Sequence, residues 1–108
     1  MKSIFLGILL TIPSLALAAT ESTDVGTITR VHFYEGINAA LVLHSGAPKN
    51  PGCPRADQYA LSKNHPFYTE IYSMLLAAAT SKTNIALTLS DQECPGNYPY
   101  IKHVYYTP

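Results

Sequence analysis

The apolar amino-terminal segment most constrains what this chain folds into, because it predicts export to an oxidising compartment. Residues 1–18 have the pattern of a signal peptide: Lys2 supplies a positive charge, and the apolar run that follows is too short and too interrupted by Pro13 to span a bilayer. Small residues favour cleavage after Ala18, with Ala19 as the alternative. We therefore expect a secreted or periplasmic domain of about ninety residues with no stable membrane insertion.

Two cysteines, Cys53 and Cys94, are all that the sequence contains. In an exported protein the compartment favours their pairing as one disulfide. Closing a loop of this length stabilises a domain by roughly 4 kcal/mol in the chain-entropy model. A catalytic thiol or a two-thiolate metal site is a weaker alternative, because neither cysteine has a Cys-x-x-Cys spacing or a neighbouring histidine.

The charge of the chain argues against one class of partner. Seven Lys and Arg balance seven Asp and Glu, and the basic residues are scattered singly along the sequence. Nucleic-acid binding depends on clustered Lys and Arg that neutralise several phosphates together. We therefore expect no nucleic-acid partner.

One helical pattern lies among several strand-like runs. Apolar residues recur at helical spacing from Pro66 to Ser81. Residues 19–25 are polar and without periodicity, which predicts a flexible arm. Loops rich in proline, glycine and polar residues are expected over 45–57 and 90–99. Enrichment in β-branched and aromatic residues, or period-two alternation, predicts strands over 27–34, 39–44, 58–61, 84–89 and 100–106.

This order of elements predicts a fold. Five strands with a helix between the third and the fourth are typical of the Greek-key β-barrel of the oligonucleotide/oligosaccharide-binding (OB) type. We predict such a five-stranded OB-type barrel for residues 26–108, held by one disulfide between Cys53 and Cys94. Another small α+β sheet is the alternative. The helix is expected to pack on the sheet and to offer its other side to a second subunit.

Four stretches also carry a family resemblance, within the range Gly26–Tyr106. They are Ile28–His32, Tyr72–Ala79, Asn84–Leu89 and Tyr98–Lys102. These stretches resemble the binding (B) subunits of subtilase cytotoxin and typhoid toxin, and related short gammaproteobacterial exported proteins. Members of the toxin family form ring pentamers and bind sialylated glycans, so the resemblance implies a homo-oligomer with a glycan as its partner.

The resemblance and the tyrosines together supply the candidate binding residues. Asp24, next to Thr23, stands where the family has a glycan-contacting serine, and its carboxylate would repel the carboxylate of a sialic acid. Sugars bind against aromatic faces, and the candidates for this contact are Tyr34, Tyr98 and Tyr100. The alternative is that these tyrosines belong to the core or the rim of a small barrel.

No residue pattern predicts an enzyme or a metal site. The chain has no Gly-x-Ser-x-Gly elbow, its acidic residues form no recognisable pair, and its histidines lack metal-ligand spacing; these are His32, His44, His65 and His103. We predict no catalytic residue, no metal and no cofactor. The leading hypothesis is an exported non-enzymatic binding module that binds a glycan. The alternatives are a periplasmic accessory subunit that binds a protein and, third, a small hydrolase or inhibitor-like protein.

Overall fold

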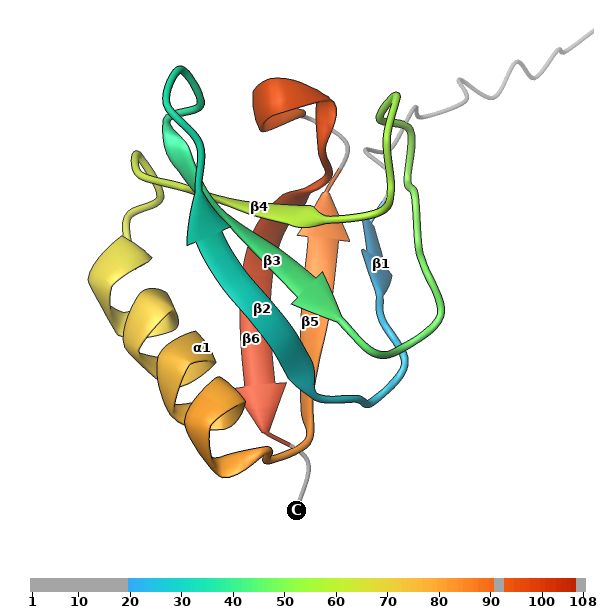
Figure 1. Cartoon of the computed structure of the whole chain (residues 1–108). Coiled ribbons are helices and arrows are strands. Elements are labelled where there is room, and N and C mark those ends of the chain that lie inside the picture. The colour runs from blue at the N-terminus through green and yellow to red at the C-terminus, as the bar shows by residue number, and fades with distance from the viewer. Residues whose placement is uncertain (1–19, 91–92, 107–108) are drawn as a thin grey trace, which may run out of the picture.

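The computed structural model describes residues 20–90 and 93–106, so the predicted signal peptide lies outside the described residues. Six strands form one sheet in the order β1-β5-β6-β4-β3-β2, and α1 covers one side of it (Figure 1). A short 3₁₀ helix, η1 (Pro95–Asn97), lies between β5 and β6. The longer elements are β1 (Thr20–Ser22), β2 (Ile28–Phe33), β3 (Ala39–His44), β4 (Tyr59–Ser62), α1 (Tyr68–Ser81), β5 (Ile85–Ser90) and β6 (Tyr100–Tyr106).

The strands follow the apolar patterns from which they were predicted. In β5 the period-two alternation buries Ile85, Leu87 and Leu89 in the main core. Ile71 and Leu75 of α1 belong to the same core cluster, since a spacing of four residues places both on one face of the helix. Neighbouring strands pair antiparallel except β4 and β6, which pair in parallel. Each fully buried leucine or isoleucine stabilises the fold by roughly 1.5–3 kcal/mol.

The predicted helix is confirmed, with a later start. It begins at Tyr68 rather than Pro66, because the preceding residues form a turn in which the His65 carbonyl accepts the Tyr68 N–H at 3.0 Å. The helix ends at Lys82, whose backbone is left-handed (φ 56°) and whose N–H donates to the Ala78 carbonyl. These two ends direct the chain from β4 into α1 and from α1 into β5.

The structure differs from the prediction at the amino-terminal side of the domain. A flexible arm was predicted over 19–25, whereas Thr20–Ser22 form β1 and pair with β5. The three side chains of β1 are all exposed, so no apolar pattern marks the strand. The next residue, Thr23, is buried; its N–H donates to the Leu87 carbonyl at 2.8 Å and its Oγ1 accepts the Leu87 N–H at 3.0 Å. The sheet therefore has six strands where five were predicted.

The edge strands β1 and β2 are consecutive in the chain but lie at opposite ends of the strand order. Between them, Gly26 exchanges two backbone hydrogen bonds with Ile85 of β5, at 2.7 and 3.3 Å. A Cβ atom at position 26 would lie 2.9 Å from the Gly46 nitrogen and from the His44 ring, so this close approach requires glycine. A closed five-stranded barrel was predicted, and the described sheet is an open one with a bridge at Gly26.

The predicted disulfide is confirmed. Cys53 and Cys94 are bonded, with their Cα atoms 5.7 Å apart. The loop before β4 is further fixed by Asn50, whose Oδ1 accepts the N–H of Cys53 at 2.7 Å. Close by, the Arg55 N–H donates to the Asn97 carbonyl of η1 at 3.0 Å. The disulfide and this hydrogen bond together attach the loop before β4 to the connection between β5 and β6.

Candidate functional site

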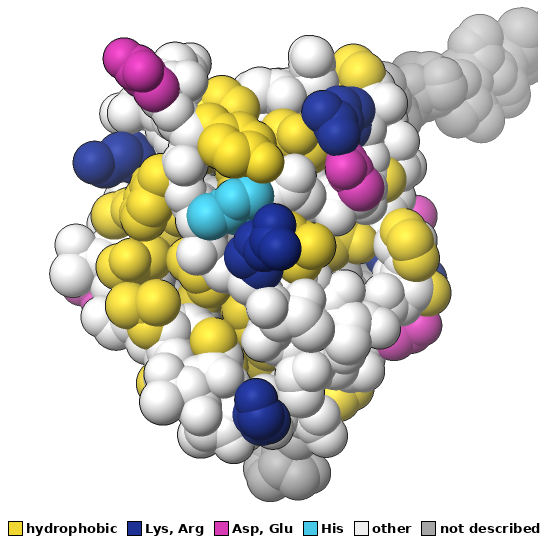
Figure 2. Space-filling model, viewed as in Figure 1, with side chains coloured by type: hydrophobic (Ala, Val, Ile, Leu, Met, Phe, Trp, Pro, Cys, Tyr) yellow, Lys and Arg dark blue, Asp and Glu magenta, His cyan; other side chains and the backbone are white. Residues whose placement is uncertain are grey.

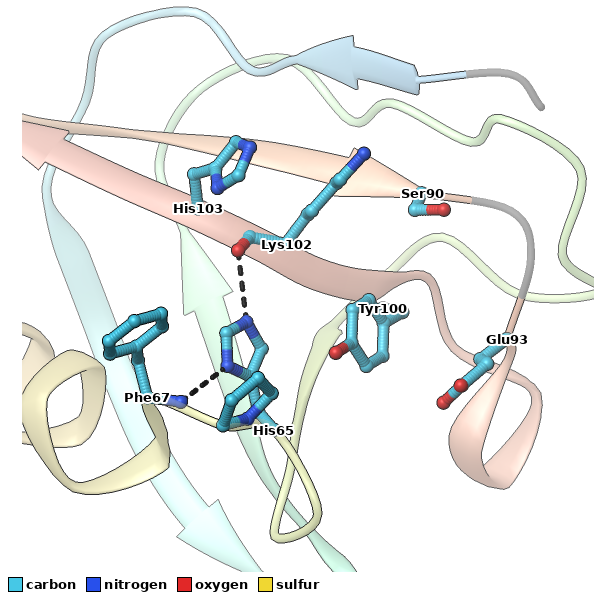
Figure 3. A pocket seen from close by; sticks show the side chains of 8 residues that line it. His65, Phe67, Ser90, Glu93, Tyr100, Lys102 and His103 are labelled. Carbon is cyan, nitrogen blue, oxygen red and sulfur yellow. Dashed lines mark hydrogen bonds between the residues drawn. The ribbon is translucent and has the colours of Figure 1, made fainter. Parts of the chain in front are cut away.

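A pocket of about 450 Å³ opens between the turn before α1 and strand β6 (Figure 3). It lies beside the place where β4 and β6 meet, a pairing recorded only at Ala60 and Tyr100 within the described residues. Three segments line the pocket: His65, Pro66 and Phe67 from the turn, Ser90 and Glu93 from the end of β5 and beyond, and Tyr100, Lys102 and His103 from β6.

His65 is the buried member of this lining. Its Nδ1 accepts the Phe67 N–H at 3.0 Å, so the ring proton is on Nε2, which donates to the Lys102 carbonyl at 2.9 Å (Figure 3). The imidazole also stacks on the Tyr100 ring, with centroids 5.5 Å apart and planes 12° apart. Both ring nitrogens are thus used within the protein, and His65 acts as a fixed wall of the pocket.

A β-bulge in β6 explains why two basic side chains line the pocket together. Ile101 and His103 pair with successive residues of β5, so Lys102 between them has no partner on that strand. Lys102 and His103 are both exposed, although side chains in a regular strand point to alternate faces. An extra residue in one strand redirects the side chains around it. The bulge therefore brings an ammonium and an imidazole to the same side of β6.

Tyr100 and Phe67 give the pocket its aromatic surface. The Tyr100 side chain is half-buried, and its hydroxyl has no hydrogen-bond partner within residues 20–90 and 93–106. Burial raises the pKa of this phenol, and the Glu93 carboxylate raises it further, so the hydroxyl stays protonated and available as a donor at neutral pH. Phe67 is 60% exposed. The arrangement offers aromatic faces together with hydrogen-bond donors and a carboxylate acceptor.

The structure does not bring the five sequence-predicted binding residues together. Tyr100 lines the pocket. Thr23 is buried and bonded to β5, and Asp24 is exposed after β1. Tyr34 is exposed after β2, and Tyr98 is buried in a small cluster that also contains residues of β3 and β4. Ligand binding by these residues stays a prediction, and Tyr100 is the one that the pocket supports.

Three pocket residues were not singled out as binding residues from the sequence: Phe67, Lys102 and His103. Two adjacent polar residues within the alternating run of β6 are a signal for a bulge, and that signal could have identified Lys102 and His103. Phe67 follows a proline at the start of a helical pattern, which marks a helix start and carries no information about a ligand. His65 was expected in a half-buried strand and instead lies in the turn before α1.

Known proteins add no assignment for this site. The chain matches no protein-family model, no curated protein and no solved structure. Within the described ranges, no three His, Cys, Asp or Glu side chains lie close enough together to hold a metal ion. None of the helices in that part of the chain has the length and apolar character needed to cross a membrane. The pocket's own chemistry is therefore the basis for a functional assignment.

Proposed function

We propose that this protein is an exported non-enzymatic binding module that holds a sugar in the pocket beside Tyr100. The observation that carries the proposal is the half-buried Tyr100 phenol without a partner in the described chain, next to the exposed ring of Phe67. Sugars place their C–H faces against aromatic rings while a few polar groups fix their hydroxyls. Lys102 and His103 provide donors for those hydroxyls, and Glu93 provides an acceptor.

The role of His65 supports binding rather than catalysis. Its two ring nitrogens are bonded to the Phe67 N–H and the Lys102 carbonyl, which leaves neither free to move a proton to or from a ligand. The imidazole contributes rigidity, because its stacking on Tyr100 holds the phenol in one orientation.

An OB-type barrel, a homo-pentamer and export are parts of the same proposal. The hydrogen bonds between Gly26 and Ile85 support barrel closure, since they attach the segment between the two edge strands to β5. The bond between Cys53 and Cys94 supports secretion or a periplasmic location, where disulfides persist. The resemblance to toxin B subunits supports a pentamer. Light scattering that gives the mass of a monomer would contradict the pentamer without affecting the pocket.

A glycan array probed with the purified disulfide-bonded protein tests the sugar proposal. We expect Tyr100→Ala to weaken binding by about tenfold or more, because it removes both the ring and the hydroxyl. Tyr100→Phe keeps the ring and should cause a smaller loss. Tyr105→Ala is the matched control, since Tyr105 is exposed on the same strand and does not line the pocket. An array on which the unchanged protein binds nothing overturns the proposal.

An exposed apolar surface favours a second candidate function, a protein-binding accessory subunit. Phe33 of β2 and Leu76 of α1 are both exposed, and the Phe33 ring contacts Tyr72 at 5.9 Å. Tyr72 in turn stacks on Tyr68. Hydrophobic side chains gather over α1 and β2 on the face in Figure 2. A protein captured by the unchanged chain and lost with Phe33→Ser, together with a blank glycan array, would favour this role.

A further inference from the structure

A second group of polar and aromatic side chains lies outside the pocket. We name it the Tyr34 patch, and it consists of His32, Tyr34, Arg55 and Asp57. It shares no residue with the pocket lining. Tyr34 follows β2 and is 46% exposed, and Arg55 and Asp57 lie in the loop before β4 with more than half of each side chain exposed. Figure 2 shows a histidine on this face of the molecule, bordered by hydrophobic and basic side chains.

Buried polar groups hold the patch from below. Gln58 is 8% exposed, and its Oε1 accepts a hydrogen bond from Nε2 of His32. The Gln58 amide nitrogen donates to the hydroxyl of the buried Tyr98, at 3.5 Å. The His32 ring meets Tyr34 edge to face, with centroids 4.8 Å apart. The exposed tyrosine thus has a neighbour whose ring cannot turn freely, which is the supporting arrangement that precise binding sites require.

Arg55 is held on the other side of the patch. Its guanidinium lies over the Tyr98 ring, 4.9 Å from the centroid, and its Nη2 donates to Asp57 Oδ2 at 2.8 Å. Asp57 raises the pKa of Arg55, and the phenols of Tyr98 and Tyr34 add smaller effects in the same direction, so these groups surround the guanidinium. The disulfide at Cys53 fixes the same loop.

We propose that the Tyr34 patch is a second ligand site, and that it takes an uncharged sugar ring. The exposed Tyr34 ring provides an aromatic face for C–H groups. Arg55 keeps unused N–H donors and Asp57 keeps unused lone pairs beside them, an arrangement that suits hydroxyls, which both donate and accept. An acidic ligand would meet the Asp57 carboxylate and a basic ligand would meet the Arg55 guanidinium, so the pair selects against both.

NMR titration of the disulfide-bonded protein with methyl β-D-glucoside, methyl β-D-galactoside and methyl α-D-mannoside tests this proposal. Single sugars bind weakly, so each glycoside is added up to about 50 mM. We expect at least one of them to shift the signals of Tyr34, His32 and Arg55. Glucuronic acid, which carries a carboxylate, is expected to leave these signals in place. No shift in the patch with any of the three glycosides overturns the proposal.

Variants separate the patch from the pocket. Tyr34→Ala should weaken glycoside binding at the patch by about tenfold, whereas Tyr105→Ala, at a tyrosine of similar exposure, should leave it unchanged. Asp57→Asn removes the negative charge and should let glucuronic acid shift the Arg55 signal. Tyr100→Ala should leave patch binding intact, which distinguishes this site from the pocket. A Tyr34→Ala variant that titrates like the unchanged protein contradicts the assignment.

Discussion

His44 at the end of β3 and His65 before α1 have imidazole rings that are bonded in the same way. Nδ1 of each accepts the backbone N–H two residues later, at 3.0 Å. Nε2 of each donates to a carbonyl on a distant strand: Ile85 of β5 at 2.8 Å for His44, and Lys102 of β6 at 2.9 Å for His65. Each ring therefore joins a local turn to a strand far away in the sequence.

The surroundings of the two rings differ. A Cβ atom at Gly26 or Gly46 would lie 2.9–3.0 Å from the His44 ring, so backbone fills the space beside it. The His65 ring instead stacks on Tyr100 and borders the pocket. The same hydrogen-bond pattern fastens the sheet near the Gly26 bridge and supports one wall of a ligand-sized hollow. What stands beside the ring, rather than how it is bonded, distinguishes the two regions.

Removal of the disulfide should have the largest effect and should fall unequally on the two regions. The loop that it closes, 53–94, contains His65 and α1 but not His44. Changing Cys53 and Cys94 together to alanine is expected to lower the free energy of unfolding by about 4 kcal/mol, measured by urea denaturation. Hydrogen exchange should show a greater loss of protection in α1 than in β2 and β3. A loss below about 1 kcal/mol would contradict the expectation.

Alanine at each histidine compares the two rings directly. His65→Ala should cost about 3 kcal/mol, because two hydrogen bonds and the stacking on Tyr100 are lost. His44→Ala should cost about 2 kcal/mol, because the Ile85 carbonyl still accepts the Gly26 N–H. Chemical denaturation of both variants measures the difference. A greater loss for His44→Ala would show that the two regions are ranked wrongly.

The close packing around His44 can be tested without changing the histidine. Gly26→Ala places a Cβ 2.9 Å from backbone and should cost about 2 kcal/mol. Gly36→Ala is the control: its φ is 93° but nothing lies within 4 Å of the added carbon, so only backbone strain of about 1 kcal/mol is expected. Thermal unfolding compares the two variants. Equal losses would mean that the Gly26 region can relax around a methyl group.

The smallest effect concerns alkaline pH. Burial is the largest cause that raises the pKa values of Tyr59, Tyr68 and Tyr100. In the unfolded chain these phenols ionise near pH 10, before they do in the folded protein, so stability should fall as the pH rises above about 10. Tyr100→Phe removes one of the three groups and should make this fall less steep. Unfolding measured from pH 8 to 11 checks the slope, and an unchanged slope would contradict the role given to Tyr100.

Much of the fold was predictable because burial leaves a local pattern. The alternation over 84–89 and the helical spacing from Pro66 to Ser81 reflect one buried face each, and both elements formed. The disulfide followed from two cysteines and the expected compartment. Strand β1 was missed because its three exposed residues are held by ladder hydrogen bonds alone, which any side chain permits.

The pocket was less predictable because it depends on distant residues. His65 and Lys102 meet only after β6 has taken its place beside β4 and β5, and nothing in either local sequence specifies that contact. Tyr100 was selected for its residue type, and Tyr98 was selected by the same reasoning although its side chain is buried. Residue type indicates what a tyrosine can do, whereas the fold decides whether a ligand can reach it.

The parallel pairing of β4 and β6 has a consequence for how the chain reaches its native state. It joins Ala60 to Tyr100, and the disulfide joins Cys53 to Cys94, at a sequence separation of 41 and only a few residues earlier on each side. In the reduced chain the search that brings β6 to β4 must close this long loop anew. In the oxidised chain the crosslink already holds the two segments near one another, so refolding should be faster when the thiols have paired first.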